Sequence, residues 1–215
     1  MTPFNYTGTE TVAAIPANVV DWVLVELRKP ASGAPADASA STIIGRKAGF
    51  LKNHGTIVDL DGTTPLRFDI TKQGASFITV RHRNHLGVMS NSIPSNAAGS
   101  FANDFSVLAN AYKNPVVSSQ PLALLSGGSV YGLWAGDANR SGNIAASDVT
   151  GIKNAIANGL SGYQLTDVNM SGNLAASDVT LARAMISQGG QGSSPARTAG
   201  TPKKIQSHIP DPVTE

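Results

Sequence analysis

The chain contains no cysteine and few charged residues. Without cysteine, neither disulfide bonds nor thiol chemistry can contribute to its function, and the redox compartment stays undetermined. Charged residues make up 14% of the 215 residues, and the dispersed basic residues give a net charge of +2, unlike a nucleic-acid-binding protein. No apolar run approaches the ~20 residues of a membrane span. The hydrophobic content of 41% is nevertheless sufficient for a packed core.

The N-terminus, residues 1–6, lacks a charged region followed by an apolar one, which is the pattern of a signal peptide. Gly, Ala, Ser, Thr and Asn take the place of charged residues, a composition common in exported bacterial proteins. We therefore expect an extracellular or cell-surface location. This expectation requires either that a signal has been removed or that the chain is a segment of a longer protein.

One segment of fourteen residues occurs twice, thirty residues apart. Residues 137–150 read DANRSGNIAASDVT and residues 167–180 read DVNMSGNLAASDVT, so eleven of the fourteen positions are identical. The three differences spare every position that carries a side-chain oxygen. This selective identity indicates that the oxygens perform the function.

Both copies fit a twelve-residue calcium loop, with oxygen side chains at places one, three and five, glycine at six and a carboxylate at twelve. A hard cation takes six to eight oxygens, and a tight turn brings alternate residues onto its inner surface. The sequence thus predicts two Ca²⁺ sites. The predicted ligands are Asp137, Asn139, Ser141, Asn143 through its carbonyl, and Asp148, and in the second loop Asp167, Asn169, Ser171, Asn173 and Asp178.

The alternative is that each loop is an Asx-type turn that caps a helix and binds no metal. Each loop carries only two carboxylates. Because calcium affinity rises with ligand charge, we expect weak sites suited to millimolar extracellular calcium. Apolar residues at helical spacing follow both loops, at 149–156 and 179–186, and predict two short helices that end before Gly159 and Gly189.

The region 136–188 resembles the dockerin module, which mates with cohesin domains in cellulosome-type assemblies. Both loops, their thirty-residue offset, and Lys153 and Arg183 at equivalent helix positions carry the resemblance. In dockerins the residues before the last carboxylate help to choose the partner. The corresponding residues are Ala146, Ser147, Ala176 and Ser177. Their identity in both halves implies that a partner could bind in two orientations.

The first 135 residues predict strands and turns, and the whole chain is expected to be mostly β. We expect a strand-like segment at 1–17, a β-sandwich of about seven strands at 18–135, the dockerin-like module at 136–188, and a linker with a strand-like tail at 189–215. The predicted strands are 18–28 in the centre, 43–51, 56–60, 66–70, 76–89 and 129–134. Asp61-Gly62 predicts a hairpin turn, residues 31–41 a low-complexity loop, and residues 101–112 fit either a strand or a helix.

Three stretches of this region carry a second resemblance: 20–28 (VDWVLVELR), 57–62 (IVDLDG) and 81–86 (RHRNHL). They are similar to a module in large secreted and surface proteins of Bacteroidetes-type bacteria. That module commonly precedes a dockerin-like repeat and has no assigned chemistry. The resemblance covers about residues 10–135.

Several residues suggest catalysis without forming a convincing site. His82 and His85 could bind a metal, but residues three apart on a strand point to opposite faces, so a polar strand end bonded to neighbouring loops is favoured. Asp59 and Asp61 are better explained by a solvated turn than by an acid pair. Trp22 is predicted to be core. Trp134 is predicted to lie in the core or at a domain junction. We expect no enzyme activity.

The sequence therefore favours a non-catalytic extracellular structural protein. It would be a filament subunit that binds copies of itself through strand exchange by residues 1–12 or 203–215, with calcium as a structural clamp. The alternative is a dockerin-type adaptor that docks a surface- or carbohydrate-binding β-sandwich onto a cohesin-like partner. A glycan is a possible addition on Ser and Thr of residues 31–42.

Overall fold

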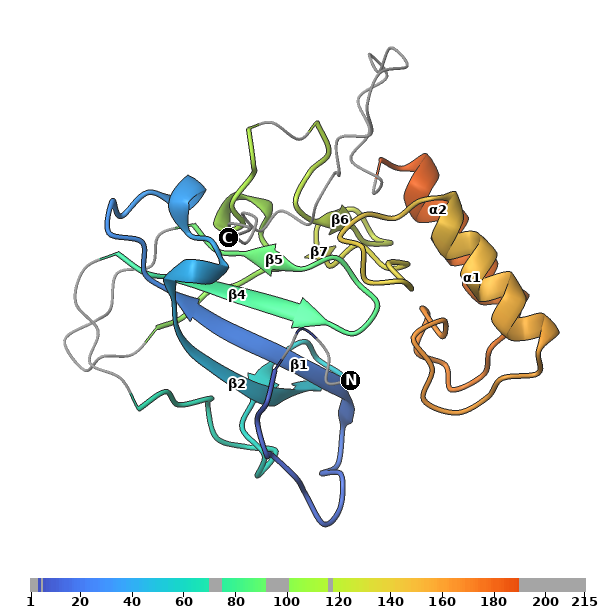
Figure 1. Cartoon of the computed structure of the whole chain (residues 1–215), viewed down its shortest axis with the longest axis horizontal. Helices are drawn as coiled ribbons and strands as arrows, with labels where there is room; N and C mark the ends of the chain where they lie inside the picture. The colour runs from blue at the N-terminus through green and yellow to red at the C-terminus, as the bar shows by residue number, and fades with distance from the viewer. Residues whose placement is uncertain (1–3, 5, 70–74, 92–100, 116–117, 190–215) are drawn as a thin grey trace.

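The computed structural model, drawn in Figure 1, describes residues 4, 6–69, 75–91, 101–115 and 118–189. Within these residues the protein is mainly β, with a curled antiparallel sheet of five strands, a two-stranded ribbon and two α-helices. The strand order in the larger sheet is β3-β2-β1-β4-β5. The predicted tail at 203–215 and the linker from residue 190 onward lie outside the described residues.

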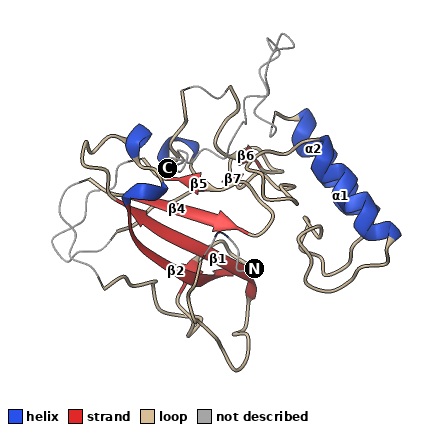
Figure 2. Cartoon of the chain, in the orientation of Figure 1, coloured by secondary structure: helices blue, strands red, loops and turns tan. Residues whose placement is uncertain are grey.

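The helices and strands follow the chain in a simple order, with both α-helices after all the strands. Figure 2 shows the two helices lying together beside the strands. The larger sheet contains β1 (Val19–Arg28), β2 (Ile43–Lys52), β3 (Ile57–Val58), β4 (Phe77–His82) and β5 (Val88–Met89). The ribbon contains β6 (Ala123–Leu124) and β7 (Tyr131–Gly132), and the helices are α1 (Ala146–Ala157) and α2 (Ala176–Ser187). No helix among the described residues is long and apolar enough to span a membrane.

The central position predicted for the first long strand is confirmed, because β1 pairs with β2 on one side and β4 on the other. Cross-strand partners point to the same face of a sheet. Val25 therefore shares a face with its partner Val80, while Glu26 shares the opposite face with Thr79. The first of these faces carries the main apolar core: Val23, Val25, Val80, Val88, Ala111 and Leu122.

The single strand predicted for residues 76–89 is wrong. The chain reverses between β4 and β5, which pair with each other through Thr79 with Met89 and Val80 with Val88. The chain reverses where polar residues no longer take part in the hydrogen-bonded pairing between strands. Arg83 and Asn84 instead bond to residues 164–167, just before and at the start of the second repeat, as described below.

The hairpin predicted around Asp61 is also wrong for the described residues. The turn forms, with the Asp61 carboxylate accepting from the N–H groups of Thr63 and Thr64 at 2.8 Å each. Residues 66–69 nevertheless form no strand. The side chains of this segment pack over glycines of β2 instead, since a Cβ on Gly45 would lie 2.8 Å from Phe68.

Of three other segments, residues 31–41 form a loop, as predicted, and residues 6–12 differ from prediction. Residues 6–12 form no strand, and Glu10 contacts the sheet through its side chain, which accepts from the N–H of Ala48 at 3.2 Å. The 31–41 loop is held to the sheet, because the buried carbonyl of Ala38 accepts from Arg28 at 2.7 Å. Residues 101–112 contain only one 3₁₀ turn, Leu108–Asn110.

Both predicted helices form, at the predicted places. They pack against each other and share a small core of Ala138, Val149, Ile152, Val168, Val179 and Ala182. Figure 1 shows the helix pair at the end of the sheet where β4 stops. A second apolar cluster includes Leu86, Trp134 and Ile144, with Met185 and Ile186 of α2 packed against it. This cluster joins the repeats to the β region.

Candidate metal centre

The first predicted loop turns its oxygen-bearing side chains inward. The carboxylate of Asp137 accepts from the backbone N–H groups of Ser141 at 2.8 Å and Gly142 at 3.0 Å. The amide oxygen of Asn139 accepts from the same Ser141 nitrogen at 2.9 Å, so the two side chains lie together. The Ser141 hydroxyl donates to the carbonyl of Asn143 at 3.3 Å. Places one, three, five and seven therefore meet on the inside of the turn.

The helix α1 brings the last predicted ligand to this loop. Asp148 lies in the first turn of α1 and is fully buried. Its carboxylate accepts from the N–H of Asn139 at 3.1 Å and from that of Ala145 at 2.9 Å. A carboxylate at this position also interacts favourably with the positive end of the helix dipole.

The second loop repeats the arrangement closely. Its Asp167 accepts from two backbone N–H groups, its Asn169 from one, and its Asp178 links the loop to the start of α2. The bonds are Ser171 N to Asp167 at 3.1 Å, Gly172 N to Asp167 at 3.0 Å, Ser171 N to Asn169 at 2.9 Å, Asn169 N to Asp178 at 3.1 Å, Ala175 N to Asp178 at 2.9 Å and Ser171 Oγ to the Asn173 carbonyl at 3.0 Å.

The backbone of the two loops also agrees. Arg140 and Met170 adopt φ values of 58° and 57°, and the glycines at place six both have φ of 80°. Left-handed backbone is favourable for glycine and costs other residues about 1 kcal/mol or more. The similar sequences thus fold into the same local conformation twice.

Negative charge accumulates in the first loop. Burial, together with the neighbouring carboxylate of Asp148, raises the pKa of Asp137 to about 7, against the lowering effect of its backbone hydrogen bonds. Burial also raises the pKa of Asp148. Within the described residues, neither carboxylate has a basic side chain in ion-pair contact. Two buried carboxylates that face each other favour a bound cation, which would relieve their repulsion.

The donor set of each loop fits calcium better than a transition metal. Carboxylate, amide, hydroxyl and carbonyl oxygens are hard ligands, and hard divalent cations prefer them. Among the described residues no group of three or more His, Cys, Asp and Glu side chains is placed to hold a metal. Any cation in these loops would thus rely on the neutral oxygens of Asn and Ser as well as on two aspartates.

The residues predicted to choose a partner lie on the surface. Ala146 and Ser147 in the first turn of α1 are exposed, as are Ala176 and Ser177 in α2. The Ser147 hydroxyl accepts from the amide of Asn139 at 3.2 Å, and Ser177 makes the equivalent bond at 3.0 Å. Each pair is therefore attached to its loop and open to solvent.

A polar clamp connects the segment before the second repeat to the sheet; its Asp21 and Arg83 are buried, and its Tyr163 is largely exposed. Asp21 accepts from Arg83 at 2.6 Å and from the hydroxyl of Tyr163, in the segment between the helices, at 2.5 Å. The guanidinium of Arg83 also stacks on the Tyr163 ring, 4.2 Å from its centre, and donates to the carbonyl of Gln164. Burial would raise the pKa of Asp21, but hydrogen bonds from His82, Tyr163 and Arg83 lower it well below its ordinary value.

The neighbouring Asn84 completes this attachment. Its amide donates to the backbone carbonyls of Leu165 at 2.9 Å and Asp167 at 2.7 Å. The sequence had indicated a polar strand end bonded to neighbouring loops, and this is what forms. The same sequence argument was wrong in one respect: His82 and His85 do converge, with ring centres 4.4 Å apart. They converge because β4 ends at His82 and the chain bends before His85.

The other acidic residues considered for catalysis are an ion-pair partner and an exposed turn residue. Asp59 pairs with Lys47 at 2.6 Å, and Asp61 is exposed in its turn. Trp134 is buried at the junction with the repeats, as predicted. Trp22 is only half-buried and lines a pocket, so its assignment to the core was wrong.

Sequence reasoning missed Asp21 and Tyr163, which form the clamp. They are 142 positions apart, and only Asp21 lies in a stretch singled out in the sequence, residues 20–28. The only signal was Asp21 itself, a charged residue inside an apolar strand, which implies a buried partner. No protein-family model, no curated protein and no solved structure matched this chain.

Proposed function

We propose that this protein is a non-catalytic structural subunit, exported from the cell, that assembles with copies of itself into filaments and uses calcium as a clamp. The observation that carries the proposal is the attachment of the repeats to the sheet. A plug that acts alone usually hangs on a flexible linker. Here Arg83 and Asn84 hold residues 164–167, at the start of the second repeat, through part-buried and buried hydrogen bonds, and Trp134 leads into the first loop within three residues.

Calcium fits this role because each loop is joined to the helix that follows it through its last aspartate. Each places two aspartates, an asparagine and a serine around one turn, and the last aspartate comes from the following helix. In this proposal the ion screens the two carboxylates and fixes each helix to its loop, while the sheet and the β6–β7 ribbon form the two layers of the expected β-sandwich. The ion takes no part in a reaction.

The sheet also offers an edge to a neighbouring subunit. Among the described residues, β3 pairs only with Phe50 and Leu51 of β2, so the earlier part of β2 has a strand neighbour on one side only. A strand from another copy could add at such an edge through main-chain hydrogen bonds. We propose residues 203–210 as the donor rather than 1–12, because Glu10 already holds the N-terminal segment on its own sheet.

Electron microscopy of the purified protein tests the proposal directly. In millimolar calcium we expect filaments, and chelation should loosen or dissolve them. Deletion of residues 203–215 should abolish assembly in light scattering, whereas deletion of 211–215 alone, which spares the proposed donor strand, should not. Dispersed monomers in both conditions would contradict the filament proposal.

The adaptor function is the second candidate, and the exposure of the twin Ala-Ser pairs favours it. In this reading a cohesin-like partner binds either helix start, in two orientations. Changing Ser147 and Ser177 together should then weaken binding far more than either change alone. The exposed Thr150 and Thr180, one helix turn further along, provide matched control positions. An equal loss from each single change would count against dual binding.

A further inference from the structure

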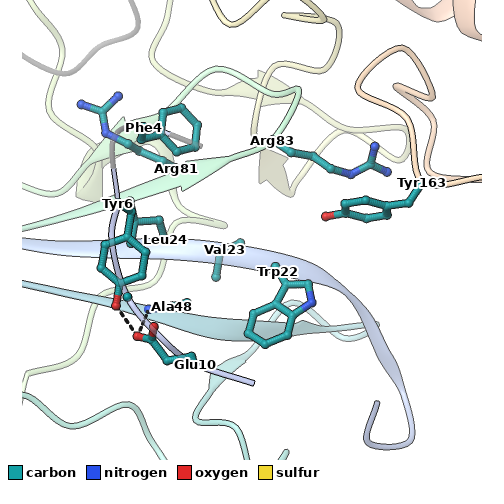
Figure 3. Close-up of a pocket in the computed structure, with 11 residues that line it drawn as sticks. Phe4, Tyr6, Glu10, Trp22, Val23, Leu24, Ala48, Arg81, Arg83 and Tyr163 are labelled. Atoms are coloured by element: carbon teal, nitrogen blue, oxygen red, sulfur yellow. Dashed lines mark hydrogen bonds between the residues drawn. The ribbon is translucent and has the colours of Figure 1, made fainter. Parts of the chain in front are cut away.

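A pocket of about 280 Å³ lies on the face of the sheet opposite the main core. Its lining comes from five parts of the chain: the N-terminal segment, the neighbouring strands β1 and β2, the end of β4 with Arg83 just beyond it, and the segment between the two helices. The small side chain of Ala48 helps to leave the space open, beside Leu24 of β1. Figure 3 shows the lining side chains arranged around this space.

Aromatic residues are concentrated around this pocket. The chain has 6 Phe, 4 Tyr and 2 Trp, and four of these twelve line the pocket: Phe4, Tyr6, Trp22 and Tyr163. They come from three separate segments, so local sequence composition does not explain their meeting. Aromatic walls offer flat apolar surfaces that suit a ligand with flat faces.

The charge next to the pocket favours an acidic ligand. The buried Glu26 is shared by three guanidinium groups, those of Arg28 at 2.6 Å, Arg81 at 3.1 Å and Arg46 at 3.2 Å. One carboxylate cannot balance three cations. Arg81 lines the pocket, and the buried Nε of Arg46 has no hydrogen-bond partner in the part of the chain that the structure describes.

Glu10 is the acidic side chain that lines the pocket, and it is already engaged. Its carboxylate accepts from the Tyr6 hydroxyl and from the backbone N–H of Ala48. Figure 3 shows it on the opposite side of the pocket from Arg81. A ligand would therefore meet a cationic wall at one side and a hydrogen-bonding wall at the other.

We propose that this pocket binds one sugar residue that carries a carboxylate. The ring faces would pack against the aromatic walls, the hydroxyl groups would meet the Tyr6–Glu10 pair, and the carboxylate would pair with Arg81. The volume is at the lower limit of small-molecule pockets, which suits one ring rather than an extended peptide. The proposal is independent of the filament function and of calcium.

Methyl β-D-glucuronide and methyl β-D-glucoside are the probes that test it, because they differ mainly in the carboxylate. Trp22 fluorescence should report saturable binding, since Trp134 is buried elsewhere. We expect the glucuronide to bind at least tenfold more tightly than the glucoside. Equal binding of the two sugars, or no binding of either, would overturn the proposal.

Two variants locate the site. Arg81→Met should reduce glucuronide affinity about tenfold and leave the weak glucoside binding nearly unchanged, whereas Arg67→Met, at an exposed arginine outside the pocket, should change neither. Heteronuclear NMR spectra of each variant establish that it is folded. An Arg81→Met protein that is folded and still prefers the glucuronide would also overturn the proposal.

Discussion

The two loops have nearly the same sequence and the same backbone, but they lie in different surroundings. In the first, Ile144 is fully buried in the apolar cluster with Trp134, and no basic side chain in the described residues pairs with Asp137. In the second, the equivalent Leu174 is half-buried, and the guanidinium of Arg83 lies 3.9 Å from the carboxylate of Asp167. The first loop attaches to the sheet through apolar contacts and the second through polar ones.

This difference shows that a repeated motif fixes local conformation but not electrostatic environment. The ligand geometry follows from oxygens and glycines at fixed spacing. The charge around each loop depends on which residues of the β region contact it. As proposed calcium sites, the two loops should therefore be equivalent in shape and unequal in affinity, and the following predictions separate these two properties.

The largest expected effect comes from breaking the polar clamp of Asp21, Arg83 and Tyr163, which lies next to the second loop. Asp21→Ala should lower the free energy of unfolding by about 3–5 kcal/mol, because it leaves Arg83 buried without its partner. Urea unfolding measures the change. Asp59→Ala, which removes a partly exposed ion pair with Lys47, should cost less than about 1 kcal/mol and serves as the control. Equal losses would show that the clamp contributes little.

The clamp also marks the limit of prediction from sequence. Alternation and β-branched residues located β1 and β2, and helical spacing located α1 and α2, because these signals act over a few neighbouring residues. The turn between β4 and β5 escaped prediction because its cause, bonds from Arg83 and Asn84 to residues 164–167, lies about eighty positions away. The inward direction of the loop oxygens followed from their spacing. The meeting of Trp22 and Tyr163 at one pocket did not.

The next prediction concerns how stability depends on pH, and it tests the buried carboxylate of Asp137 in the first loop. The pKa of Asp137 in the folded protein is raised to about 7, so without calcium its protonated form stabilises the fold. This stability is fully present below about pH 4 and is lost as pH rises through 7, by on the order of 3 kcal/mol. Thermal or urea unfolding with a chelator, at pH 5 and pH 8, measures it.

The replacement Asp137→Asn provides the control, because it removes the titrating group. Burial lowers the pKa of His85 well below its ordinary value, so this residue adds stability as pH rises from 5 and acts in both proteins. The difference between wild type and variant therefore isolates Asp137, while the effects of the low pKa of Asp21 lie at more acidic pH. Saturating calcium should also remove the Asp137 contribution in the wild-type protein, since the ion stabilises the ionised form. The same pH dependence in Asp137→Asn and in the wild-type protein, without calcium, would contradict the argument.

A smaller effect tests the inequality of the two sites. Asp148→Asn should disable the first loop and leave the second, and Asp178→Asn should do the reverse. Because Arg83 repels a cation near Asp167, the site left in Asp148→Asn should bind calcium about tenfold more weakly than the site left in Asp178→Asn. Calcium titration by calorimetry measures both constants. Equal constants would mean that Asp21 fully neutralises Arg83.

The smallest expected effect tests the backbone conformation, which the two loops share. Arg140→Gly and Met170→Gly each relieve a left-handed backbone, at φ of 58° and 57°, but each also increases the freedom of the unfolded chain. The two terms nearly offset each other, so each change should raise stability by less than about 1 kcal/mol. Asn154→Gly, on the exposed face of α1, should instead lower it by about 0.3 kcal/mol. The stability changes of the two loop variants should match, because both positions share one backbone conformation whatever charge lies nearby. A gain in one and a loss in the other would show that the surroundings alter the turn itself.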